Sequence, residues 1–237
     1  MQLGIKLTLD YTFKRVFGGE KNKHLLIHLI NSIINFPHNE IITEIELKDP
    51  FNHKTYQADK ESILDIKAKD NFGHLYDIEM QTMIEKAYPE RILFYLSKLY
   101  TEQLEAGDKY SNLKPCISIS FVDGILFNEN NNYSNIFLLK NADGSVLFSN
   151  KFIFYVFELP KFTLGESELS NNNEKWLYLI KHSEKLETNK LPTKLMEDLY
   201  MEAVKELDVI SKTEEEKMLY EKRFKFLCDI ATVRGEG

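Results

Sequence analysis

The stretch from Glu61 to Met83, ESILDIKAKDNFGHLYDIEMQTM, constrains the fold of this chain more than any other segment. It contains two runs in which apolar and polar residues alternate, and strict alternation predicts β-strands because successive side chains point to opposite faces. Between the runs, Asp70 to Gly73 matches a three-residue hairpin loop that Gly73 closes in the left-handed conformation. In that register Asp70 faces His74, and the segment is predicted to form a β-hairpin.

The register of this hairpin separates charged from apolar surface. Facing residues point to the same side of a sheet, and here Asp65 stands opposite Glu79. The polar face carries Asp65, Lys67, Asp77, Glu79 and Gln81. The other face carries Leu64, Ile66, Ala68, Tyr76, Ile78 and Met80, which suit a hydrophobic core.

The facing carboxylates of Asp65 and Glu79 admit two interpretations. Like charges directly opposite each other repel, so the sheet gains no stability from this pair. A divalent cation between them would reverse the sign of the interaction, and magnesium is usually held by one or two carboxylates with water and substrate phosphate. Alternatively, this is the solvent-exposed face of an antiparallel hairpin, where charges are ordinary. The pattern alone slightly favours the second interpretation.

Four motifs follow one another along the first half of the chain. They are D-x-x-F-K-x-x-F-G at Asp10 to Gly18, a leucine-rich helix from His24 to Asn31, a strand from Lys60 to Asp65, and I-E-M-Q at Ile78 to Gln81. This ordered set resembles the PD-(D/E)XK nuclease superfamily, and more narrowly its recombination-promoting nuclease / putative transposase branch. Each motif alone is weak, and the order and spacing make the set specific.

The resemblance implies a metal site. Asp65, Glu79 and the main-chain carbonyl of Met80 would hold Mg²⁺, with Mn²⁺ as an alternative. A bound ion lowers the pKa of its water and holds a phosphate oxygen, which is the chemistry that phosphodiester hydrolysis needs.

The resemblance also implies roles for nearby polar residues. Gln81 stands where most relatives carry lysine, and glutamine can orient a water molecule but supplies no charge. Lys67 either supplies that charge or pairs with Asp77, and the sequence leaves both open. The catalytic candidates are Asp65, Glu79, Gln81 and Lys67, and the candidates for contact with substrate are Lys14, Lys60 and Arg91. Lys14 and Arg15 are each otherwise expected on a solvated helix face.

The remaining periodicities complete a fold. They predict a short helix from Asp10, a helix over 21–35, a strand from Ile41 to Leu47, a helix from Tyr88 to Ala106 and a strand over 115–122. With the hairpin these give an α/β (α+β) fold, a restriction-endonuclease-like α-β-β-β-α-β core with a mixed sheet. The buried stripe of the fourth element is expected to comprise Ile92, Leu93, Leu96, Leu99, Tyr100 and Leu104.

Beyond the core, the chain predicts an extra hairpin over 133–159 and C-terminal helices over 174–186, 193–207 and 213–232. We expect the aromatic residues of the second hairpin strand to form sheet core rather than a base-stacking platform; they are Phe148, Phe152, Phe154, Tyr155 and Phe157. The predicted division is a nuclease-like domain over 1–165 and a helical extension over 166–237.

Composition limits the kinds of partner and compartment that this chain is expected to have. Net charge of −7 counts against a generic nucleic-acid binder, because phosphate contacts come from Lys and Arg, but it says nothing of a local basic patch. No apolar stretch is long enough to cross a bilayer, no signal peptide is apparent, and two distant cysteines suit a reducing compartment. We therefore expect a cytoplasmic protein with DNA as its partner and no membrane contact; whether two copies form a homodimer stays open.

The leading hypothesis is a magnesium-dependent DNA endonuclease associated with recombination or transposition. The alternative is a catalytically inactive nuclease-fold domain that binds DNA or protein. A third hypothesis, an interaction module that acts through the helical tail, would not depend on the acidic pair.

Overall fold

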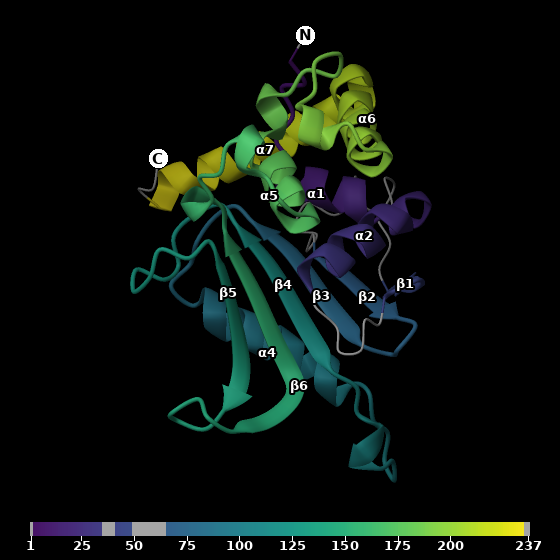
Figure 1. The fold of residues 1–237 in the computed structure, drawn as a ribbon, viewed down its shortest axis with the longest axis vertical. Helices are drawn as coiled ribbons and strands as arrows, with labels where there is room; N and C mark the ends of the chain where they lie inside the picture. Colours follow the sequence, from purple (N-terminus) through teal and green to yellow (C-terminus); the bar gives the residue numbers. More distant parts are fainter. Residues whose placement is uncertain (1, 35–40, 49–64, 235–237) are drawn as a thin grey trace.

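The computed structural model describes residues 2–34, 41–48 and 65–234. One six-stranded mixed sheet crosses the molecule in the order β1-β2-β3-β4-β6-β5 (Figure 1). The strands are β1 (Ile45–Leu47), β2 (Ile66–Asp70), β3 (Leu75–Gln81), β4 (Cys116–Val122), β5 (Ser134–Lys140) and β6 (Leu147–Glu158). The neighbours β3, β4 and β6 run parallel, and the outer pairings are antiparallel. This is the mixed α/β architecture that the sequence predicted.

Helices cover both faces of the sheet. They are α1 (Asp10–Phe17), α2 (Lys23–Ile33), α4 (Tyr88–Thr101), α5 (Asn172–His182), α6 (Asp198–Lys212) and α7 (Glu214–Arg234). Helix α4 lies on one face, and the other helices gather on the opposite face and at one end of the strands (Figure 1). Helix α4 also links β3 to β4, which supplies the crossover that a parallel pair requires. No helix in the described ranges is both long and apolar enough to span a membrane.

The hairpin that pairs β2 with β3 has the predicted register. Lys67 pairs with Asp77, Ile66 pairs with Ile78, and Gly73 takes a φ of +86°. The carboxylate of Asp70 holds the loop, because it accepts hydrogen bonds from the backbone N–H of His74 (2.8 Å) and from the Tyr76 hydroxyl (2.8 Å). Burial raises the pKa of Asp70, but the hydrogen bonds with the His74 side chain (2.9 Å), with Tyr76 and with the His74 backbone outweigh burial and lower that pKa below its usual value.

Two elements are shorter than predicted. Strand β1 begins at Ile45 rather than Ile41, because the backbone of Ile42 is bound by the Asn31 side chain of α2 (2.8 and 2.9 Å). Helix α4 ends at Thr101, since the Gln103 side chain binds both backbone groups of Lys114 and turns the chain away.

Two predictions of burial were wrong. Leu93 is 50% exposed, because it lies on the rim of α4 beside an open pocket. Phe148 is 85% exposed, because the hairpin of β5 and β6 extends past the helices that cover the rest of the sheet (Figure 1). Tyr155 and Phe157, farther along β6, are buried as expected.

The C-terminal helices share a core with the N-terminal half. Phe17 of α1 packs edge-on against Trp176 of α5, with ring centroids 5.4 Å apart, and both side chains are fully buried. One continuous cluster of buried side chains includes residues of α1, α2, the sheet, α5, α6 and the start of α7. The division into 1–165 and 166–237 stays a prediction.

Buried ion pairs connect α1 to the C-terminal helices α6 and α7. Arg15 donates to Glu216 of α7 (2.9 Å) and to Glu206 of α6 (3.0 Å), and the Tyr11 hydroxyl also donates to Glu216 (2.8 Å). Arg15 and Lys14 are only 8% and 4% exposed, so the expectation of a solvated helix face was wrong for both.

Replacement of Glu216 by alanine should therefore lower the free energy of unfolding by about 3 kcal/mol, because it leaves the buried Arg15 guanidinium without its main partner. Urea denaturation measures this change. The matched control is Glu221→Ala on the same helix, whose exposed pair with Lys217 (3.9 Å) should contribute less than about 0.5 kcal/mol. Equal effects of the two substitutions would contradict the prediction.

Candidate active site

The polar face of the hairpin brings three carboxylates together. The Ile66–Ile78 pair places Asp65, one residue before β2, across from Glu79, as predicted. Asp65 also hydrogen-bonds the side chain of Asp77, and its charge raises the pKa of Glu79. The carboxylates therefore lie near one another on the side of the sheet that α4 covers.

Asp77 is a member of this cluster that sequence reasoning assigned only as a partner for Lys67. It is 6% exposed, and its Oδ1 atom is buried without a hydrogen-bond partner in the described part of the chain. Burial, followed by the charges of Asp65 and Glu79, raises its pKa well above the usual value. The alternation placed Asp77 on the polar face, but its burial depends on α4 covering that face (Figure 1), which the alternation does not reveal.

Lys67 is bound within the same cluster. Its ammonium lies 3.6 Å from Oδ2 of Asp65, and its charge also lowers the pKa of Asp77. Of the two interpretations left open by the sequence, the pairing with a carboxylate is present, but the nearer partner is Asp65 rather than Asp77. The Lys67 side chain is 39% exposed, so it remains accessible from solvent.

Arg91 of α4 connects Glu79 to Gln81. Its Nη2 atom donates to Oε1 of Glu79 and, at 2.6 Å, to Oε1 of Gln81. The guanidinium lies over the ring of Tyr88, 5.1 Å from its centroid, and the Tyr88 hydroxyl donates to Glu79 at 3.5 Å. Arg91, expected from its place in the helix to brace the site or touch phosphate, thus contacts two of the predicted site residues.

Burial raises the pKa of Glu79 to about 7, and the charges of Asp65 and Asp10 add to this increase. Arg91 lowers the pKa of Glu79, but burial outweighs that contribution. Such a carboxyl holds its proton readily when no cation is bound, and it loses that proton when positive charge arrives.

The start of α1 closes one side of the site. The Thr82 hydroxyl, directly after β3, donates to the carbonyl of Thr8 at 3.0 Å. Asp10 is the first residue of α1, and the guanidinium of Arg223 from α7 binds both of its carboxylate oxygens. The helix begins at Asp10, as the sequence predicted, and Leu9 occupies the N-cap position.

The other predicted site residues are distributed differently. The Met80 side chain is buried on the opposite face, as the alternation requires, and Lys14 lies buried in α1. Lys60 lies outside the described residues. A role for the Met80 carbonyl in metal binding, or for Lys14 in substrate binding, stays a prediction.

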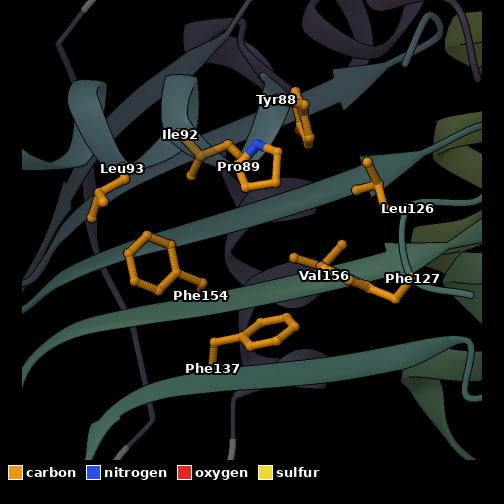
Figure 2. Close-up of a pocket in the computed structure, with 9 residues that line it drawn as sticks. All are labelled: Tyr88, Pro89, Ile92, Leu93, Leu126, Phe127, Phe137, Phe154 and Val156. Atoms are coloured by element: carbon orange, nitrogen blue, oxygen red, sulfur yellow. The ribbon is translucent and has the colours of Figure 1, made fainter. Parts of the chain in front are cut away.

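An apolar pocket of about 230 Å³ lies between the start of α4 and the strands β5 and β6, and Figure 2 shows the residues that line it. Its wall is formed by Tyr88, Pro89, Ile92, Leu93, Leu126, Phe127, Phe137, Phe154 and Val156. The hydroxyl of Tyr88 reaches Glu79 while its ring lines the pocket, so an apolar surface borders the polar site directly.

The donor set fits a hard divalent cation with few protein ligands. Among the described residues, no three His, Cys, Asp or Glu side chains are arranged to hold a metal by themselves. Magnesium typically takes one or two carboxylates and completes its shell with water and phosphate, so a site built on Asp65 and Glu79 is compatible with it. The unpartnered Oδ1 of Asp77 and the raised pKa of the buried Glu79 indicate that Lys67 and Arg91 only partly offset the negative charge of this cluster.

Comparison with known proteins agrees with the motifs. A family model described as PD-(D/E)XK nuclease family transposase matches residues 7–235, which includes the C-terminal helices. Searches of curated proteins and of solved structures give no match.

In the metal-free protein, the Glu79 carboxyl should titrate near pH 7, and ¹³C NMR of the glutamate carboxyls, assigned with Glu79→Gln, measures this pKa. Asp65→Asn should lower the value because it removes a like charge. The pKa of Glu79 is higher in the folded state than in the unfolded state, so the unfolded state binds fewer protons between about pH 4.5 and 7. The free energy of unfolding should therefore decrease as the pH rises through that range. This decrease should be smaller in Glu79→Gln, and a titration of Glu79 near pH 4.5 would contradict the prediction.

Proposed function

Because this chain belongs to the PD-(D/E)XK nuclease family transposases, we propose that it is a divalent-metal-dependent DNA endonuclease acting in recombination or transposition. The observation that best supports the proposal is the gathering of Asp65, Asp77 and Glu79 on one sheet face, with Lys67 and Arg91 bound to them. Family membership establishes a nuclease-related protein, and the metal, the substrate and the activity are part of the proposal.

Asp65 and Glu79 would hold the metal, with the Met80 carbonyl as a further ligand. Bound there, Mg²⁺ or Mn²⁺ would supply a water of lowered pKa and neutralise charge on the phosphate. Asp77 contacts Asp65 from the buried side and so fixes the orientation of that ligand. To coordinate the ion, the Glu79 carboxylate would have to give up part of its hydrogen bonding with Arg91.

Arg91 would supply the positive charge that Gln81 lacks. Most relatives in the wider superfamily carry lysine where this chain has Gln81, whereas the resembled branch characteristically carries glutamine, and the Arg91 guanidinium contacts the Oε1 atom of that glutamine. Arginine keeps its charge at any physiological pH and matches phosphate oxygens geometrically. In this proposal Gln81 orients the attacking water while Arg91 stabilises charge on the phosphate.

A homodimer remains part of the proposal rather than a finding. Strand β5 forms an edge of the sheet in the described part of the chain, and it exposes Ile136, Phe137, Leu138 and Leu139. Exposed apolar edges of this kind are sites of strand pairing between copies.

The second candidate function is a catalytically silent domain that binds DNA or a protein. It is favoured by one observation, the neutral Gln81 in place of a lysine. Such a domain would show no cleavage with any metal, and Asp65→Asn would leave its binding unchanged.

Nicking of supercoiled plasmid in Mg²⁺ tests the leading proposal. Asp65→Asn and Glu79→Gln should each lower the rate roughly 100-fold or more, since a metal contributes several kcal/mol to the transition state and each 1.4 kcal/mol is tenfold. EDTA should abolish nicking. The control is Glu221→Gln, which removes an exposed carboxylate of α7 and should leave the rate unchanged. Nicking that survives Asp65→Asn would refute the proposal.

A double-mutant cycle tests the pairing of Arg91 with Gln81. Gln81→Lys should lower the nicking rate, because it places a second cation against the guanidinium. Arg91→Gln should lower the rate roughly 10- to 100-fold, which is typical for a residue that orients metal ligands. The combined variant should recover part of the loss, and purely additive effects would show that the two positions act independently.

A further inference from the structure

A groove beside the carboxylate cluster concentrates positive charge. It has a volume of about 540 Å³ and is lined by Lys48, Lys67, Lys69, Gly73, Leu75, Leu99, Glu102, Gln103, Asn112 and Lys114. Four of these residues are lysines and one is acidic, in a chain whose net charge is −7. The groove is therefore positively charged, although the chain as a whole is negatively charged.

The sheet places two of these lysines in line with the candidate active site. Lys67 and Lys69 alternate with buried residues along β2, so both point to the face that carries the carboxylates. Lys67 contacts Asp65, whereas Lys69 lies two residues farther from it. The groove thus begins at the metal-binding candidate and runs away from it along the strand.

Lys114 is held in place from two sides. Gln103 binds its backbone N–H at 2.9 Å and its carbonyl at 3.1 Å. Its aliphatic chain lies against Gly73 in the hairpin loop, where an added Cβ would come within 3.3 Å of it. A lysine fixed along its stem presents its ammonium at a defined place and loses less freedom on binding an anion.

The ammonium groups of Lys69 and Lys114 are exposed, and neither forms an ion pair with a carboxylate in the described ranges. Glu46 of β1 stands opposite Lys69 of β2, but the Glu46 carboxylate forms its ion pair with Lys48, at 2.7 Å. The groove therefore keeps positive charge that its own carboxylates do not cancel.

We propose that this lysine groove binds the sugar–phosphate backbone of the substrate DNA next to the bond that is cut. This inference rests on the proposed nuclease function and adds the surface that holds the strand. Lysines contact phosphates without reading sequence, so the groove would contribute affinity and position rather than base specificity.

The test measures binding of a fluorescein-labelled DNA duplex by anisotropy in the Asp65→Asn background, which prevents cleavage. The variant Lys69→Gln with Lys114→Gln should bind roughly 10-fold or more weakly at 0.1 M salt, because two phosphate contacts are lost. The slope of log K against log salt should fall by about 1.8, at about 0.9 per contact. The matched control is Lys205→Gln with Lys222→Gln, which changes net charge equally on exposed positions of α6 and α7 and should bind like the parent.

Each outcome separates the groove from the nuclease proposal. Equal weakening by both lysine pairs would assign the effect to net charge and overturn the groove. Unchanged binding by the Lys69 and Lys114 variant would also overturn it, even if the parent chain cleaves plasmid. Weakened binding without cleavage by the unsubstituted chain would retain the groove and refute the nuclease. Tighter binding of an RNA duplex, with the same loss in the variant, would reject DNA as the ligand.

Discussion

The antiparallel pairing of β2 with β3 is the constraint on which the rest of the structure depends. Side chains alternate with a period of two, so a slip by one residue would turn Ile66 and Ile78 out of the main core and turn the carboxylates into it. Asp70 prevents this slip because its carboxylate collects hydrogen bonds from the loop and from Tyr76. The buried Asp70 carboxylate at the turn thus determines which side chains face each other at the far end of both strands.

The site formed in this way is electrostatically costly. Asp77 is buried beside two other acids. Glu79 is removed from solvent and contacts Arg91 and Tyr88 instead. Groups of like charge in a dry environment lower stability unless positive charge reaches them. Local rules are most often violated where function requires it, and here the violation coincides with the family motif.

The sequence predicted the elements whose signals are local. The alternation on both sides of Gly73 was sufficient for the register, and the apolar run of β4 was sufficient for a buried interior strand. It could not predict where β1 begins, because the side chain of Asn31, in a different element, binds the backbone of Ile42. The burial of Arg15 was missed for the same reason, since its partners Glu206 and Glu216 lie about 200 residues away. In the site, Asp65 and Glu79 follow from register alone, whereas the contact of Arg91 with Gln81 depends on how α4 packs.

The pairs that join α1 to the last two helices have a consequence for biosynthesis. Asp10 begins the motif that characterises the first half of the chain, yet its partner Arg223 is near the C-terminal end. A ribosome must therefore translate the chain through α7 before α1 can make all of these contacts. A polypeptide that still lacks α7 leaves Asp10 without Arg223 and leaves Arg15 with only Glu206 of α6, so the packing around α1 is completed late in synthesis.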